Sequence, residues 1–157
     1  MLLPMADLTG MELRWMRDPS SGLKHSLSSR AGLAGRLAFA ESCGSLASGQ
    51  TAHGSWSLKR EGFLHPRVSI RRAGSEVTLG ILSLSLGGNG VLTLPGGEEY
   101  RFTASGWSRS QWGFDKGPRT IVRFERTPDG SKVTFGQATE DAETLSILCL
   151  LGCYMPL

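Results

Sequence analysis

The sequence contains no apolar run of about 20 residues, the length that crosses a bilayer as a helix. Its most apolar stretch begins at Leu145, near the end of the chain, and is clearly shorter. The opening residues, MLLPMADLTG, lack the basic start and long apolar core of a secretory signal. We therefore expect a cytoplasmic protein without a transmembrane segment.

Cysteine and histidine are scarce, with three residues of each. The cysteines, Cys43, Cys149 and Cys153, are odd in number, which argues against a disulfide framework and favours reduced thiols. Cys149 and Cys153 would share one helix face, but a zinc site generally needs four ligands. We expect them to be buried as small apolar side chains. The sequence predicts no metal site and no cofactor.

Motifs of catalysis are absent as well. The sequence has no G-x-S-x-G elbow, and residues 87–90, GGNG, lack the lysine and following helix of a phosphate-binding loop. Glu98 and Glu99 are adjacent in an expected hairpin, so their carboxylates point to opposite faces and cannot act as a pair. These absences favour a non-catalytic protein.

Glycine, in contrast, is abundant, at 21 of the 157 residues, and this fits many tight turns between short strands. Apolar and polar residues alternate through most of the chain, with a loop expected at 42–50. The pattern predicts a flexible lead at residues 1–10 and one mainly β domain at 11–157. Strands are expected at 12–17, 24–30, 34–41, around Trp56 and Leu58, around Val68 and Ile70, from Val77 to Leu86, at 91–94, 100–103, around Trp112 and Phe114, at 121–126, and around Val133 and Phe135.

The alternation changes phase between Ile81 and Leu82. A slip of one residue turns every following side chain to the other face of a sheet. We therefore predict a β-bulge or a strand break next to Gly80.

The final segment, from about residue 140 to 155, differs from the rest. Acidic residues crowd its start, which suits the positive end of a helix dipole, and Thr139 is the expected N-cap. From Leu145 onward almost every residue is apolar, with no polar face. Such a helix must be enclosed. We expect it to form a core around which the β-rich chain wraps.

An internal repeat is also visible. The pattern W-S-x4-G-F at 56–63 recurs at 107–114, P-R at 66–67 recurs at 118–119, and G-S-x-V-T-x-G at 74–80 recurs at 130–136. The repeat predicts two similar meanders. In them Trp56 corresponds to Trp107, Phe63 to Phe114 and Val77 to Val133.

Basic residues concentrate in the middle of the chain, although the net charge is only +3. Residues 54–126 hold 11 Lys/Arg and 6 Asp/Glu, a balance of +5. Alternation places Arg67 and Arg71 on one exposed face, and the repeat aligns Arg119 with Arg67. Such a stripe suits the phosphates of a lipid headgroup, whereas the small net charge does not point to nucleic acid. The candidate ligand-binding residues are Lys59, Arg60, Arg67, Arg71, Arg119 and Arg123, with the alternative that these charges only solvate the outer face.

The segment G-x-W-x-x-K-R-x-G-F at 54–63, followed by P-R-V-x-I-R at 66–71, resembles the tubby C-terminal-like superfamily, within it the LURP-one-related and small bacterial members. Trp107, residues 112–114 and the tail at 150–154 extend the resemblance over residues 10–157. It implies a closed antiparallel barrel of about twelve strands around a buried C-terminal hydrophobic helix, as in phospholipid scramblases. Because tubby proteins bind phosphoinositides through basic barrel residues, it also implies phospholipid binding, by analogy of fold.

Three interpretations of function follow. The first is a non-catalytic, monomeric cytoplasmic module that engages anionic lipid headgroups at the membrane surface through a basic barrel face. The second is a structural or protein-interaction barrel with no lipid role. The third is an enzyme with a site at the mouth of the barrel, which would require titratable groups with shifted pKa values in a pocket.

Overall fold

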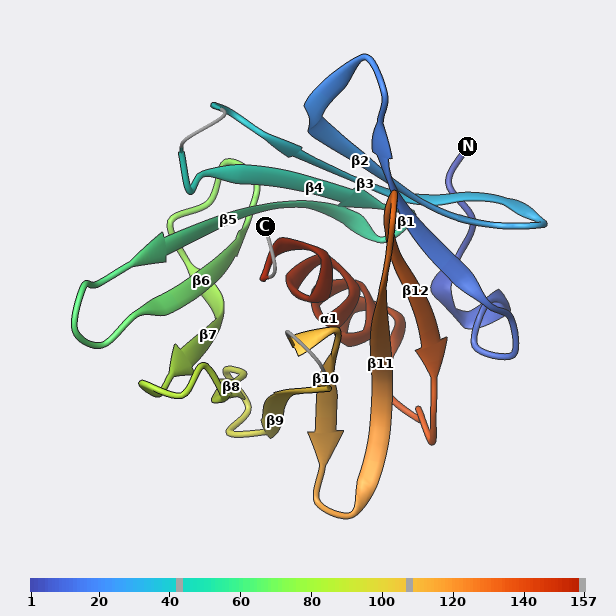
Figure 1. Ribbon diagram of the computed structural model, residues 1–157. Coiled ribbons are helices and arrows are strands. Elements are labelled where there is room, and N and C mark those ends of the chain that lie inside the picture. The colour runs from blue at the N-terminus through green and yellow to red at the C-terminus, as the bar shows by residue number, and fades with distance from the viewer. Residues whose placement is uncertain (42–43, 107–108, 156–157) are drawn as a thin grey trace.

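The computed structural model describes residues 1–41, 44–106 and 109–155, and it is a closed barrel of twelve antiparallel strands around one helix (Figure 1). Each strand pairs with the next one in the chain, and β1 pairs with β12 to close the sheet. The predicted twelve-stranded barrel with a C-terminal helix is confirmed. The elements are η1 (Met5–Asp7), β1 (Leu13–Asp18), β2 (Ser21–Ser29), β3 (Gly32–Phe39), β4 (Ala47–Thr51), β5 (Gly54–Glu61), β6 (Arg67–Arg72), β7 (Thr78–Leu84), β8 (Gly90–Thr93), β9 (Glu99–Ser105), β10 (Gln111–Lys116), β11 (Arg119–Thr127), β12 (Gly130–Phe135) and α1 (Ala142–Tyr154).

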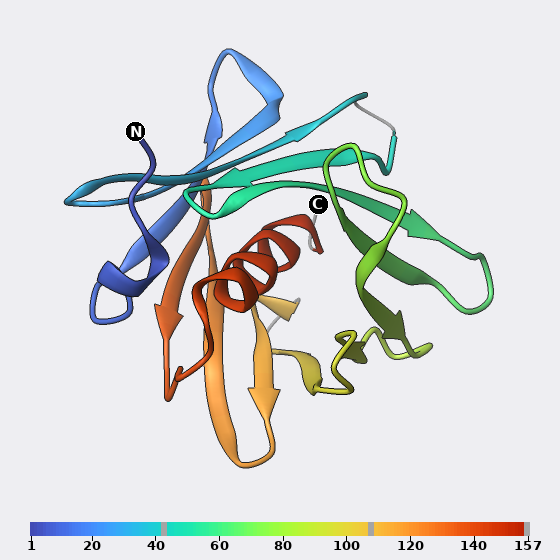
Figure 2. The ribbon, with the colours of Figure 1, turned by 180° about the vertical axis from the view of Figure 1, so that it is seen from behind.

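The helix α1 lies inside the barrel, as Figures 1 and 2 show from opposite sides. Every residue from Leu145 to Tyr154 is buried. The side chains of Trp15 and Trp112 hold the helix at one position along the barrel axis. Their indole N–H groups donate to the Cys149 carbonyl at 3.2 Å and to the Gly152 carbonyl at 2.7 Å. No helix among the described residues is long and apolar enough to cross a membrane.

The helix begins later than the sequence predicted. Its N-cap is Asp141, not Thr139, because the Asp141 carboxylate accepts the backbone N–H of Thr144 at 2.8 Å. That hydrogen bond holds the pKa of Asp141 below its usual value. Thr139 instead accepts a hydrogen bond from Arg119.

Cys149 and Cys153 are buried and free, as expected of small apolar side chains. Burial raises the pKa of the Cys149 thiol to about 12, so this thiol stays protonated at neutral pH. Cys43 lies outside the described residues.

The prediction of a loop at 42–50 is wrong at its second half, because β4 (Ala47–Thr51) forms part of the barrel wall there. Its inward residues are small or polar, so the strand lacks the large apolar residues by which the others are found. Their small size has a cause: a Cβ on Gly49 would lie 2.7 Å from a methyl carbon of Leu150. The strand therefore makes room for the helix.

The expected flexible lead at residues 1–10 is packed against the barrel rather than separate from the domain. Met5 and Leu8, in and beside η1, are buried in the same core as the helix. The Met5 backbone N–H donates to His53 Nε2 at 3.1 Å. Figure 2 shows this segment near the start of α1. The sequence concealed this contact because a short apolar lead has no periodicity.

The predicted bulge next to Gly80 is confirmed. Ile70 pairs with Gly80 and Arg71 pairs with Thr78, so Leu79 has no partner across the ladder. The extra residue restores Gly80 and Leu82 to the inward face.

The predicted repeat fails at the level of residues. Phe63 is 95% exposed in a loop, whereas Phe114 is fully buried on β10. Val77 and Val133 differ in the same way, at 67% and 0% exposed. Trp107, the proposed counterpart of Trp56, lies outside the described residues. Both segments are three-stranded meanders, but so is every other stretch of this barrel, so shared strand order is no sign of a repeat.

Candidate functional site

The predicted basic stripe is divided between two parts of the barrel wall. Lys59, Arg67 and Arg71 lie on β5 and β6, whereas Arg119 and Arg123 lie on β11, and four strands separate β6 from β11. The predicted alignment of Arg119 with Arg67 is therefore wrong. The sequence pattern could not reveal this, because it rested on the repeat.

Most of these residues already have acidic partners. Arg119 forms an ion pair with Glu140 at 3.7 Å, and Arg123 forms one with Asp115 at 3.2 Å. Lys59 and Arg67 both approach Glu61, at 3.6 and 3.9 Å. The two pairs with Glu61 are about half-exposed on both sides and contribute little to stability, whereas the carboxylates of Glu140 and Asp115 are nearly buried. Their positive charge is partly neutralised, although Lys59 and Arg67 share Glu61, so they attract an anion less than arginines without an acidic partner do.

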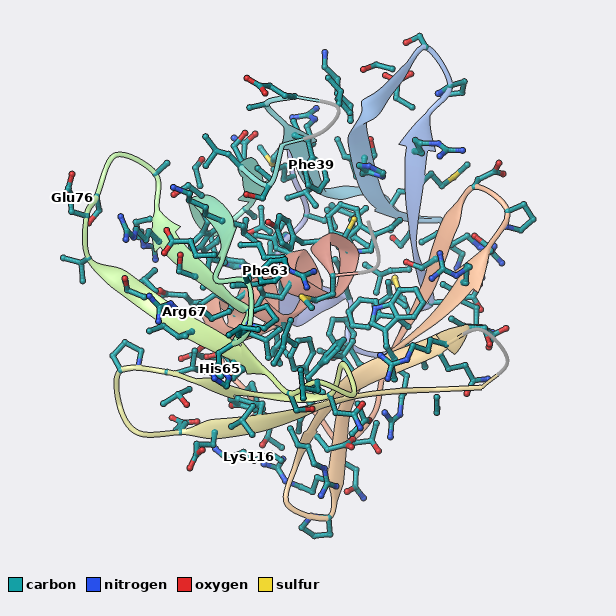
Figure 3. All side chains as sticks on the ribbon, turned by 60° about the vertical axis from the view of Figure 1, so that its left-hand side comes forward. Phe39, Phe63, His65, Arg67, Glu76 and Lys116 are labelled. Atoms are coloured by element: carbon teal, nitrogen blue, oxygen red, sulfur yellow. The ribbon has the colours of Figure 1, made fainter. Side chains whose placement is uncertain are left out.

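Arg60 is the one predicted site residue that lies elsewhere. On β5 the inward residues are Trp56 and Leu58, both fully buried, and Arg60 continues this row two residues later. The strand ends at Glu61, so Arg60 stands on the inner rim of the barrel. Figure 3 looks toward this end, with α1 in the middle.

We call this end, where α1 finishes, the mouth. The chain is a simple meander, so the loops that follow odd-numbered strands all lie at the mouth. The last turn of α1 meets them there: the Tyr154 hydroxyl donates to the Ser45 carbonyl, in the loop between β3 and β4. The Tyr154 ring also stacks on Phe39, with centroids 5.4 Å apart.

Two further arginines reach the mouth in the same manner as Arg60. Arg17 follows the buried Trp15 by two residues on β1, and Arg126 follows the buried Phe124 by two residues on β11. All three strands run toward the mouth. The signal in the sequence is therefore a buried apolar residue, one intervening residue and an arginine at the end of a strand. Sequence reasoning missed it because strand direction relative to the barrel ends was unknown.

Three cavities surround the end of α1 and share these residues. The first, of 380 Å³, is lined by His25, Phe39, Glu41 and Arg60, among others. The second, of 290 Å³, is lined by Arg60, Leu84, Gly88, Phe102, Ala104, Arg109, Trp112, Arg126 and Met155. The third, of 300 Å³, is lined by Arg17, His25, Trp112, Arg126 and Asp129, among others. Because neighbouring cavities have lining residues in common, they form a ring around the helix end.

The second cavity, which we call the arginine pocket, carries the strongest positive charge. Arg60, Arg109 and Arg126 line it, and no carboxylate does so among the described residues. None of these arginines forms an ion pair with a described acid. The end of a helix dipole offers only about half a negative charge. Three guanidinium groups exceed that, so the pocket is suited to an anion.

The floor of the arginine pocket is fixed by Trp112. Its ring stacks on Phe124, with centroids 5.8 Å apart, and its N–H donates to the last turn of α1. The Arg126 guanidinium lies over the same ring, 5.5 Å from its centroid. A cation–π contact of this kind holds the guanidinium in place while leaving its N–H groups free to donate. Arg109 donates to the Gly87 carbonyl, which ties it to the loop between β7 and β8.

His25 is the titratable group between the other two cavities. It is 6% exposed, and its ring lies edge-on to Phe39, with centroids 6.1 Å apart. Burial, and then the nearby charge of Arg17, lower the pKa of His25 below its usual value. At neutral pH the imidazole is therefore uncharged, and the positive charge of the mouth comes from the arginines.

The lowered pKa of His25 predicts a loss of stability in mild acid. The unfolded chain takes up a proton at about pH 6.5, whereas the folded protein resists it. Stability from this group is therefore complete above about pH 6.5 and declines as the pH falls toward the lowered pKa. We expect the urea midpoint to fall more between about pH 7.5 and 5.5 in the unmodified protein than in His25→Gln, which cannot take the charge. An equal fall in both proteins would contradict this role of His25.

Among the described residues, no three His, Cys, Asp or Glu side chains are grouped so as to hold a metal ion. The mouth is therefore best described by its arginines. No family model, curated protein or solved structure matches this chain, and the resemblance to the tubby C-terminal-like superfamily stays a prediction.

Proposed function

We propose that this protein is a non-catalytic cytoplasmic binding module that engages anionic phosphate-bearing headgroups at a membrane surface. The observation that carries the proposal is the arginine pocket: Arg60, Arg109 and Arg126 line one cavity without a carboxylate among its described residues. Guanidinium groups match phosphate oxygens with paired N–H donors. The proposal moves the binding site from the outer-wall stripe, where Arg67, Arg119 and Arg123 have acidic partners, to the mouth.

The size and the walls of the pocket support a headgroup as the ligand. Its volume of 290 Å³ is close to the lower limit of about 300 Å³ for ligand pockets, so a small group fits best. Beside the arginines its walls are apolar, with Leu84, Phe102 and Met155 among them. In a phosphate with an attached apolar chain, the phosphate would contact the arginines and the chain would contact the apolar walls.

The charges at the opposite end of the barrel also favour the mouth as the end that faces the membrane. There the start of α1 is surrounded by acids, including Glu98, Glu140 and Glu143, which pair with Lys116, Arg119 and Arg72. Because these acids are paired with cations, that end carries little net charge, so an anionic surface would attract the mouth more strongly. The protein is therefore polarised along the axis of α1.

The test measures binding to vesicles of phosphatidic acid in phosphatidylcholine by co-sedimentation at low salt. We expect the unmodified protein to bind and Arg60→Gln/Arg126→Gln to bind about thirtyfold more weakly, since each arginine near an anionic surface contributes about 1 kcal/mol. Binding should also decline with added salt, because ions screen these charges.

The matched control is Arg30→Gln/Arg36→Gln, which removes two exposed arginines that line none of the three mouth cavities. Both double variants should melt within a few degrees of the unmodified protein, so that lost binding is not lost folding. Equal weakening in the two double variants would show a general charge effect and contradict the pocket. Absence of binding by the unmodified protein would end the lipid proposal and favour the protein-interaction barrel.

A further inference from the structure

Large apolar side chains are exposed in three consecutive loops at the mouth. Phe63 and Leu64, between β5 and β6, are 95% and 69% exposed, and Leu86, between β7 and β8, is 96% exposed. Leu46, just before β4, is 49% exposed. Because β3 to β8 are neighbours in the barrel, these loops form a continuous section of its rim. We call these four residues the apolar arc.

The loops that carry the arc are ordered by hydrogen bonds. The Ser85 N–H and hydroxyl both donate to the Asn89 carbonyl, at 2.7 and 3.0 Å, and Gly88 N–H donates back to Ser85 at 2.9 Å. Gly88 has a φ of 85°, a conformation that favours glycine in such a turn. Leu86 therefore stands at the tip of a closed turn, and its exposure is imposed by the backbone.

The loop between β5 and β6 is also tied to the end of β7. The Leu84 N–H donates to the Pro66 carbonyl at 3.0 Å, which joins the end of β7 to the loop that carries Phe63. In Figure 1 the hairpin of β5 and β6 projects farthest at the left, and Figure 3 brings its Phe63 toward the viewer, in front of α1. Phe63 thus projects in front of the end of the helix, and the exposed Leu86 stands on the neighbouring loop.

We infer that the apolar arc inserts into the interface of an anionic bilayer leaflet while the arginine pocket takes a headgroup beside it. This inference rests on the proposed function and adds which residues enter the lipid and how the barrel is oriented. Two residues that line the arginine pocket connect it to the arc. Arg60 is close to the end of β5, just before the loop of Phe63, and Gly88 lies in the same loop as Leu86. Headgroup binding and insertion would therefore occur at one edge, with the acidic end of the barrel facing away.

Charge complementarity favours a bilayer over a protein partner. Exposed apolar residues mark interaction sites of either kind. Here the two most exposed tips, Phe63 and Leu86, stand on separate loops at 95% and 96% exposed. Beside them lies the arginine pocket, whose arginines form no ion pair with a described acid. A fluid interface can surround separate apolar tips, and its anionic lipids pair with the cations behind them. A protein partner instead generally meets a closely packed apolar centre.

The direct test places a tryptophan in the arc. The described native tryptophans, Trp15, Trp56 and Trp112, are buried, so Phe63→Trp adds an exposed fluorophore. On vesicles of phosphatidic acid and phosphatidylcholine, we expect its emission to shift to shorter wavelength and to be quenched by brominated acyl chains. The matched control is Val77→Trp, which places the same fluorophore at an exposed position at the acidic end; it should show neither change.

The second test removes the arc. Phe63→Ala/Leu64→Ala/Leu86→Ala should weaken vesicle binding by about a thousandfold, since each of the three large apolar side chains is worth about tenfold. The matched control, Met16→Ala/Val77→Ala/Val91→Ala, removes exposed apolar side chains elsewhere and should bind normally. Thermal melting of both triple variants checks that they are equally folded at the temperature of the binding assay.

The outcomes separate this inference from the proposed function. Unchanged binding by the arc variant, together with no spectral shift in Phe63→Trp, overturns insertion while salt-sensitive headgroup binding still stands. Loss of binding by the arc variant without quenching by brominated chains also overturns it and points to a contact at the headgroup level. If the unmodified protein binds no vesicles, the proposed function fails and this inference fails with it.

Discussion

A chain that ends at Thr139, and so lacks α1, is expected not to fold. The five aliphatic side chains Leu145, Ile147, Leu148, Leu150 and Leu151 are at most 3% exposed. At about 2 kcal/mol each, their burial contributes roughly 10 kcal/mol, an upper figure because the unfolded chain already hides part of this area. Whole domains are stable by only about 5–15 kcal/mol.

The loss extends beyond the helix itself. Without α1, the indole N–H groups of Trp15 and Trp112 lose their acceptors, the carbonyls of Cys149 and Gly152. The inward residues of the twelve strands would line an empty lumen, and a void of that size forfeits their packing. The barrel therefore depends on its helix as an ordinary domain does not depend on a terminal tail.

Thermal melting followed by circular dichroism is the measurement for this truncation. Glu143→Ala in the full chain is the control, because it removes only a half-exposed ion pair with Arg72 at 3.1 Å and should change stability by less than about 1 kcal/mol. A truncated chain that is monomeric and melts cooperatively would show that α1 is peripheral to the fold.

The second large effect is expected at Gly152, in the last part of α1. Alanine is normally better than glycine inside a helix by about 1 kcal/mol. Here a Cβ would overlap the ring of Phe124, which stacks on Trp112 and cannot turn away. We therefore expect Gly152→Ala to destabilise the protein by about 3 kcal/mol, at the upper end of the range for overpacking.

Urea unfolding of Gly152→Ala and two comparison variants tests this expectation. Gly49→Ala also faces the helix, but there the Cβ would meet only the tip of the flexible Leu150 side chain, so a smaller loss is expected. Adding Phe124→Leu to Gly152→Ala should recover part of the stability, which a double-mutant cycle measures as a favourable coupling. A Gly152→Ala protein as stable as the unmodified one would contradict the close contact with Phe124.

Much of the architecture was determined by local patterns in the sequence. An apolar helix without a polar face had to be enclosed, and alternation in the second half identified β8 to β12. The phase slip located the bulge beside Gly80. The patterns failed in β4, where inward positions hold small residues instead of large apolar ones. Gly49 is small because a side chain there would collide with Leu150 of the helix. They also failed in the N-terminal lead, where Met5 and Leu8 are buried without periodicity.

The site was decided by the tertiary structure. The sequence showed that the middle of the chain is basic, but it could not show which arginines have acidic partners. Barrel closure brings Arg17, Arg60 and Arg126 from distant segments to one rim, while it separates Arg67 from Arg119. The physical reason is that alternation along a strand fixes only which face a side chain takes. The end of the barrel that it reaches, and the charges it meets there, depend on strand direction and on the closure of the sheet around α1.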